Sequence, residues 1–239
     1  MKPYHIGILF VHGIQGKPNQ FDYLIERMPS SVLVNNLLLP GHGATTIEFK
    51  KAAKEQWLDA VKNASAHMSA KCDHIIFVGH SMGCLLGLLA QQELKLYSAM
   101  LLLCCPFTLR PTWRYFKNSI SANLTKGKTD DPFIKAAWDA NGVSAKHSLF
   151  YLFCAHPYLE LFRIIKSVKR QKPNVPEGTV FCFSELDEIV SKRSMLYARE
   201  ASGAKVELLK GCGHNYFTPA AQSRLVNTVQ TIIKSNESP

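Results

Sequence analysis

Short apolar runs alternate with helically spaced apolar residues along most of the chain. The runs occupy residues 5–11, 31–39, 73–78, 98–105, 179–183 and 205–209. Between them, apolar residues recur three or four positions apart, which is the spacing of one helix face. Such alternation is typical of a parallel sheet with helices on both faces, because strands covered on both sides are apolar throughout. We therefore expect an α/β fold with a mostly parallel sheet.

The first helical stretch follows the first apolar run. Phe21, Leu24, Ile25 and Met28 recur at the spacing of one face. Asn19 precedes them, and its short polar side chain is well suited to cap a helix. The pattern predicts a helix here with Asn19 at its N-cap.

Residues 106–176 form an unusually long connection between the fourth and fifth runs. We expect a helical cap over the carboxyl edge of the sheet, with residues 158–170 rejoining the core, within one domain spanning residues 1–239. Its aromatic residues should partly pack the cap and partly face a substrate. They are Phe107, Trp113, Tyr115, Phe116, Phe133, Trp138, Phe150, Tyr151, Phe153, Tyr158 and Phe162.

Composition narrows the protein class. The apolar run at residues 6–11 is too short for a signal peptide, and no stretch is long enough to cross a membrane. The seven cysteines are odd in number and match no disulfide framework, which predicts free thiols and a cytoplasmic location. No C-x-x-C or H-x-x-x-H spacing accompanies them, so we expect no metal.

The chain carries a net charge of +10. Its basic residues are scattered, and no nucleic-acid-binding motif accompanies them. We interpret the charge as a solvated basic surface and expect no nucleic-acid partner.

Residues 79–83 read G-H-S-M-G, a G-x-S-x-G pattern. A strand-like run precedes the pattern and an apolar helical stretch follows it, the context in which a strained turn projects a nucleophilic serine. Gly79 and Gly83 are expected because side chains there would collide with neighbouring backbone. The pattern makes Ser81 the candidate nucleophile.

A serine hydroxyl needs a base to take its proton. His214 lies in a glycine-rich loop after the last predicted strand and is the best placed of the nine histidines. A carboxylate between serine and histidine should orient it. Asp187 follows the fifth run and is favoured, with Glu185 and Glu188 as competitors in the same loop.

Residues 12–16 read H-G-I-Q-G directly after the first predicted strand. Such a loop can present the backbone N–H of Ile14 opposite that of Met82. Two convergent N–H groups form an oxyanion hole for a tetrahedral intermediate.

These motifs, together with P-G-H-G at residues 40–43 and L-D-E-I-V at residues 186–190, resemble the α/β-hydrolase superfamily. The resemblance covers nearly the whole chain except the cap. Within the superfamily the chain is most similar to small bacterial carboxylesterases and monoacylglycerol lipases. That resemblance implies ester hydrolysis without a cofactor, with Ser81, Asp187 and His214 as the triad.

The expected function is hydrolysis of small-molecule esters with short to medium acyl chains, including monoacylglycerols, through an acyl-enzyme. No stable membrane insertion is expected, and the sequence leaves the oligomeric state open. A thioesterase or a peptidase with the same triad is an alternative. A non-catalytic binding protein on the hydrolase scaffold is another.

Overall fold

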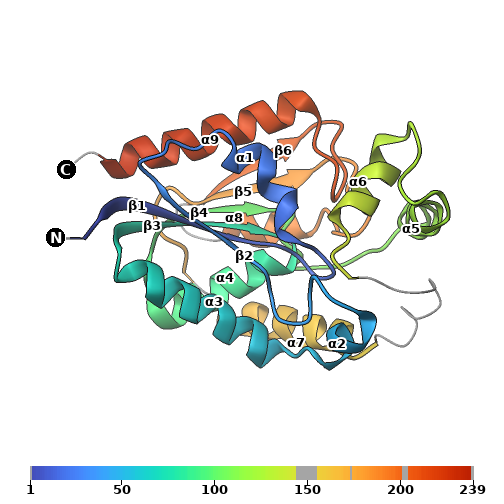
Figure 1. Ribbon diagram of the computed structural model, residues 1–239, viewed down its shortest axis with the longest axis horizontal. Helices are drawn as coiled ribbons and strands as arrows, with labels where there is room; N and C mark the ends of the chain where they lie inside the picture. The colour runs from blue at the N-terminus through green and yellow to red at the C-terminus, as the bar shows by residue number, and fades with distance from the viewer. Residues whose placement is uncertain (1, 144–154, 173, 201–203, 238–239) are drawn as a thin grey trace.

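The computed structural model describes residues 2–143, 155–172, 174–200 and 204–237 (Figure 1). A six-stranded sheet lies at its centre, with strand order β2-β1-β3-β4-β5-β6. Every strand pairing is parallel. The strands are β1 (Tyr4–Val11), β2 (Leu33–Leu37), β3 (Cys72–His80), β4 (Tyr97–Leu103), β5 (Val180–Ser184) and β6 (Lys205–Leu209). The expected α/β fold and its six strands are confirmed.

Helices cover both faces of this sheet (Figure 1). The helices of the described residues are η1 (Pro18–Phe21), α1 (Asp22–Ile25), α2 (Thr46–Lys51), α3 (Lys54–Ser69), α4 (Met82–Leu94), α5 (Trp113–Thr125), α6 (Pro132–Ala140), α7 (Ala155–Gln171), α8 (Ser194–Glu200) and α9 (Pro219–Glu237). Helices α1 and α9 lie on one face, and α3, α4 and α7 on the other. In the described residues no helix is long and apolar enough to cross a membrane.

Alternate residues of each strand enter two separate cores. On β3, Phe77 packs with the α3, α4 and α7 side, while Ile76 and Val78 pack with the α1 and α9 side. All three are fully buried. Successive side chains of a strand point to opposite faces, so a strand covered on both sides must be apolar throughout.

The expected first helix is wrong in extent and in its cap. Residues 18–25 form the short η1 and α1, which end before Met28. Asn19 lies inside η1, and its side-chain amide donates to the Asp139 carbonyl at 3.2 Å. Asn19 therefore does not cap the helix, and its amide nitrogen binds α6, which is distant in sequence.

The chain between β4 and β5 holds α5, α6 and α7. Helix α7 packs against α2, α3 and α4 and so belongs to the core layer, as expected for residues 158–170. Helices α5 and α6 pack on each other at one end of the molecule (Figure 1). Residues 144–154, with Phe150, Tyr151 and Phe153 of the expected cap, lie outside the described residues.

Candidate active site

Ser81 lies in the turn that joins β3 to α4. Its backbone has φ 52° and ψ −121°, a conformation that residues with a side chain seldom adopt. A Cβ at Gly83 would lie 2.1 Å from the Val11 carbonyl oxygen, and one at Gly79 would lie 2.8 Å from the Cys84 nitrogen. Both distances are too short for real contacts, so the turn requires glycine on each side of Ser81, as predicted.

The structure brings together the three side chains expected to form a triad. The Ser81 hydroxyl donates to His214 Nε2 at 3.1 Å, and His214 Nδ1 donates to Asp187 Oδ2 at 3.0 Å. The three residues follow β3, β6 and β5, whose carboxyl ends meet at one edge of the parallel sheet. A continuous hydrogen-bonded chain thus runs from a hydroxyl through an imidazole to a carboxylate.

The electrostatics of this chain favour a charged Asp187 carboxylate and stabilise the protonated form of the His214 imidazole. Burial alone would raise the pKa of Asp187, but the His214 ring and the amides of Val190 and Ile189 hold that pKa below its usual value. Burial alone would lower the pKa of His214, but the charges of Asp187 and Glu188 outweigh it and raise that pKa. The raised pKa makes the imidazole a stronger base toward the Ser81 proton.

The two competing carboxylates bind backbone rather than the histidine ring. Glu188 Oε2 accepts from the His214 amide at 3.0 Å and lies 3.6 Å from Arg114 Nη2. Glu185 Oε2 accepts from the Gly211 amide at 2.9 Å. Both therefore hold the histidine loop in place, and only Asp187 contacts the imidazole.

Residues 8–227 match the family model described as the alpha/beta hydrolase family. The chain belongs to the α/β-hydrolase family. This confirms the resemblance drawn from the motifs. None of the curated proteins compared with the chain matches it.

Several solved structures share this fold at low sequence identity. A soluble variant of monoglyceride lipase from Saccharomyces cerevisiae has a TM-score of 0.72 at 14% identity, covering 99% of this chain and 88% of its own. The Paleococcus ferrophilus monoacylglycerol lipase has a TM-score of 0.65 at 14% identity, with 98% and 97% covered. An N-formylmaleamic acid deformylase from Pseudomonas putida S16 has a TM-score of 0.65 at 14% identity, with 95% and 93% covered. At 14% sequence identity, the similarity of these structures to this chain shows that they share its fold.

The predicted oxyanion loop, residues 12–16, lies against Ser81. A Cβ at Gly13 would lie 2.8 Å from the Ser81 Cβ, so the loop backbone passes close to the nucleophile. Met82 is the first residue of α4, where an N–H has no acceptor within the helix. Across the described ranges, neither the Ile14 nor the Met82 N–H donates to a protein backbone or side-chain acceptor. Both N–H groups are therefore free to bind a ligand oxygen.

Two buried histidines hold this loop in shape. The amide of Leu39 donates to His12 Nε2 at 3.1 Å, and the amide of Gln15 donates to His42 Nε2 at 3.1 Å. Burial lowers the pKa of His12 to about 3 and that of His42 to about 4. Both rings therefore stay neutral near pH 7 and keep an acceptor nitrogen for these amides. The sequence places His42 in the P-G-H-G turn but does not show its bond to Gln15.

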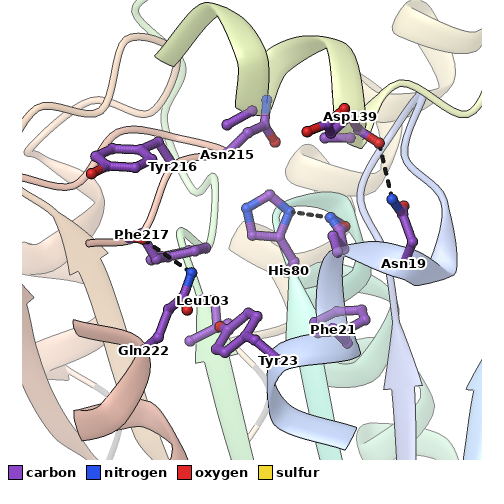
Figure 2. Close-up of a pocket in the computed structure, with 13 residues that line it drawn as sticks. Asn19, Phe21, Tyr23, His80, Leu103, Asp139, Asn215, Tyr216, Phe217 and Gln222 are labelled. Atoms are coloured by element: carbon purple, nitrogen blue, oxygen red, sulfur yellow. Dashed lines mark hydrogen bonds between the residues drawn. The ribbon is translucent and has the colours of Figure 1, made fainter. Parts of the chain in front are cut away.

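His80 is a third buried histidine with a positioning contact. Its Nε2 donates to the His214 carbonyl at 2.8 Å, and Gln20 Nε2 donates to its Nδ1 at 3.3 Å (Figure 2). Burial lowers the pKa of His80 to about 3, so this donor pattern persists at neutral pH. The G-x-S-x-G motif contains His80, but only the fold shows that it reaches the histidine loop.

A cavity of about 300 Å³ lies beside His80, on the side away from the sheet's α3 and α4 face. Its wall is mixed polar and apolar, made by Asn19, Gln20, Phe21, Tyr23, His80, Leu103, Ala136, Asp139, Ala140, Asn215, Tyr216, Phe217 and Gln222. Ser81 does not line this cavity.

One group of potential metal ligands lies together in the described residues: His80, Cys104 and His214, with ligand atoms within 4.8 Å of one another. Hydrogen bonds already engage them. His80 binds the His214 carbonyl, His214 binds Asp187, and Cys104 Sγ lies 3.3 Å from Ser184 Oγ. Each of the three side chains therefore already has a hydrogen-bond partner among the described residues.

The expectation for the cap aromatics is wrong for part of the set. Trp113, Phe116 and Phe162 are exposed, so they neither pack the core nor line a buried pocket. Phe107 is buried against Phe181, as a packing role requires. The sequence shows how many aromatics a segment carries, but not which way its helices turn them.

Proposed function

We propose that this α/β-hydrolase cleaves carboxylic esters, with Ser81 as nucleophile, His214 as base and Asp187 as the group that orients the imidazole. The observation that carries the proposal is the hydrogen-bonded chain from Ser81 Oγ through His214 to Asp187 at the carboxyl edge of the sheet. An ordinary serine in a glycine turn would have no reason to face a buried imidazole backed by a buried carboxylate.

The reaction begins when His214 takes the Ser81 proton and Oγ attacks the acyl carbon. The negative charge that forms on the carbonyl oxygen is stabilised by the N–H groups of Ile14 and Met82. Protonated His214 then gives its proton to the leaving alcohol, and the acyl-enzyme remains. Water, activated by His214, repeats the cycle and releases the acid. No step in this scheme is assigned to a metal or a nucleotide.

The proposed substrates are uncharged esters of short to medium acyl chains, including monoacylglycerols. Two of the structural neighbours are monoglyceride or monoacylglycerol lipases, which supports this choice without establishing it. We also propose that α5 and α6, within the insertion at residues 106–176, act as the cap over the substrate. Phe133 of α6 lies 4.9 Å, ring centre to ring centre, from Tyr216 in the histidine loop, which brings the insertion next to the triad.

The cysteines support a reducing, cytoplasmic setting. The structure describes six of them, all buried and all free thiols, at Cys72, Cys84, Cys104, Cys105, Cys182 and Cys212. Buried thiols in apolar surroundings behave as small hydrophobic groups and persist where disulfides do not form.

Loss of either reacting side chain should abolish turnover. We expect Ser81→Ala and His214→Ala each to lower kcat by several powers of ten, because triad members act as a unit. The measurements are p-nitrophenyl ester hydrolysis and labelling by a fluorophosphonate probe, with circular dichroism to show that each variant folds. Asn227→Ala on the exposed side of α9 is the control and should keep full activity. Near-normal turnover by a folded Ser81→Ala protein would contradict the assignment, and no labelling of the wild type would favour a non-catalytic scaffold.

The acyl chain should set specificity. Each buried methylene contributes about 0.8 kcal/mol, so kcat/KM should rise on the order of tenfold for each added pair of carbons until the pocket is full. The assay compares p-nitrophenyl esters and monoacylglycerols of rising chain length, with matched thioesters and peptide amides. A flat profile would argue against an acyl pocket, and faster cleavage of thioesters or amides would favour the alternative activities.

A further inference from the structure

Helix α5 is amphipathic, but its large apolar side chains face outward and its buried side chains are polar or small. Its buried side chains are the polar Asn118 and the small Ala122. Its large apolar side chains face outward, with exposed fractions of 78% for Trp113, 49% for Phe116, 58% for Ile120 and 78% for Leu124. A surface helix of a globular protein normally turns its apolar face inward. Burial against the described part of the chain therefore does not explain why these four residues are apolar.

The four side chains form one continuous stripe. They lie three, four and four positions apart, which keeps them on one face of the helix. From Trp113 to Leu124 the stripe is about 17 Å long at the rise of an α-helix. Contiguous apolar surface of this kind marks an interaction site rather than scattered exposure.

Positive charge surrounds this stripe. Residues 110–129 contain no Asp or Glu, but they contain Arg110, Arg114, Lys117, Lys126 and Lys128. Arg114 pairs with Glu188, whereas the other four are exposed. Within the described part of the chain, none of those four has a carboxylate within 4.0 Å. An apolar face bordered by free cations is complementary to a surface of acyl chains beneath anionic headgroups.

We propose that α5 docks on an anionic phospholipid surface, with Trp113, Phe116, Ile120 and Leu124 entering the headgroup boundary and the neighbouring cations meeting phosphates. A second copy of the chain fits this face poorly. A two-fold dimer would place the same basic border against itself, and like charges facing one another oppose association.

Docking through α5 would orient the rest of the molecule. Arg114, on the inner side of α5, donates to the Leu186 carbonyl and pairs with Glu188, next to the triad. A surface that holds α5 therefore lies near the edge of the sheet that carries Ser81 and His214. The advantage of this arrangement rests on the proposed ester hydrolysis, since uncharged acyl esters partition into lipid. The docking itself does not depend on catalysis and is measured without it.

The test uses the full-length protein and vesicles of phosphatidylcholine, alone or mixed with phosphatidylglycerol. Binding is followed by co-sedimentation and by tryptophan emission. We expect binding to the anionic vesicles that weakens as salt is added, and little binding to phosphatidylcholine alone. We also expect a blue shift on binding that comes mainly from Trp113, which is 78% exposed, because Trp57 is fully buried and Trp138 on α6 is half-buried. Trp113→Phe should remove most of the shift while keeping most of the binding.

Two pairs of variants separate the stripe from its charged border. Ile120→Ser with Leu124→Ser should weaken vesicle binding at least about tenfold, because two large apolar side chains are lost. The matched control is Leu196→Ser, which removes a leucine that is 57% exposed on α8. Lys117→Gln with Lys126→Gln should weaken binding and reduce its salt dependence. The control for charge is Lys234→Gln, an exposed lysine on α9.

Three results would overturn the proposal. The first is binding that the α5 variants leave unchanged, or no binding at all. The second is equal, salt-independent binding to neutral vesicles. The third is a concentration-dependent dimer that the Ile120→Ser and Leu124→Ser changes dissociate, which would assign the face to a second copy. A protein that docks but hydrolyses no ester would refute the proposed function and leave the docking surface intact.

Discussion

Replacing Gly83 by alanine should damage the oxyanion loop more than the fold. An added Cβ would lie 2.1 Å from the Val11 carbonyl oxygen and 2.8 Å from that of His12, whereas real Cβ contacts are essentially never shorter than 3.0 Å. Helix α4 and the end of β1 must therefore separate by about 0.9 Å, the difference between 3.0 and 2.1 Å. Residues 12–16 begin at that point and carry the proposed Ile14 donor. A displacement of about 1 Å at a reacting group costs on the order of 100-fold in rate.

Stability should fall as well, by about 1–3 kcal/mol, as for other overpacked sites. Gly87→Ala is the matched control, because an added Cβ there would lie 2.2 Å from the Phe77 ring, one turn further along α4. Both variants should lower the midpoint of urea unfolding, but only Gly83→Ala should lower kcat when activity is measured per folded, fluorophosphonate-reactive enzyme. Equal losses of kcat in the two variants, or full activity in Gly83→Ala, would refute the link between the elbow and the oxyanion loop.

The acid loop and the Arg114–Glu188 ion pair support three more predictions. Asp187→Asn should lower kcat by about 10⁴-fold, because the amide no longer fixes the imidazole tautomer, whereas Glu185→Gln, which keeps an acceptor for the Gly211 amide, should have a small effect on ester turnover. Glu188→Gln should move the acidic limb of kcat/KM to lower pH, because the negative charge that raises the pKa of His214 is lost and the imidazole stays neutral further into acid. Arg114→Gln should move that limb to higher pH, since the Glu188 charge then lacks its 3.6 Å counter-ion, while Arg110→Gln, which removes a nearby exposed charge, should leave it in place. Shifts of the same sign in the Glu188 and Arg114 variants would contradict this reading of the ion pair.

The sheet and the strained turn that carries Ser81 could be predicted because their causes are local. A strand covered on both faces needs a continuous apolar run, and each of the six predicted runs overlaps a strand. Ser81 was identified as the candidate nucleophile for the same reason, because the turn that carries it needs glycine at two fixed positions, Gly79 and Gly83. Where a backbone conformation or a periodic burial pattern decides the structure, a single sequence carries enough information.

The sequence-based predictions failed where contacts between parts of the chain that are distant in sequence determine the structure. Local spacing predicted a helix capped by Asn19, but that side chain binds the Asp139 carbonyl on α6 instead. The pattern of α5 shows an apolar face, but periodicity does not reveal whether that face points inward. Only the position of the helix in the fold shows that Trp113 and Leu124 are exposed.

The three carboxylates after β5 show why one loop resisted assignment from sequence. All three carboxylates can accept a hydrogen bond, and all three lie at a similar separation from His214 along the sequence. Residue type therefore does not distinguish them. The backbone does: Asp187 turns toward the imidazole, while the Ile189 and Val190 amides donate to its Oδ1 at 2.9 and 2.8 Å and fix its direction. Glu188 points at the His214 amide and Glu185 at an amide earlier in the same loop. Each carboxylate thus restrains a different point of the loop that carries the imidazole. Substituting any of the three therefore acts through His214. Only a substitution of Asp187 acts on the imidazole ring itself.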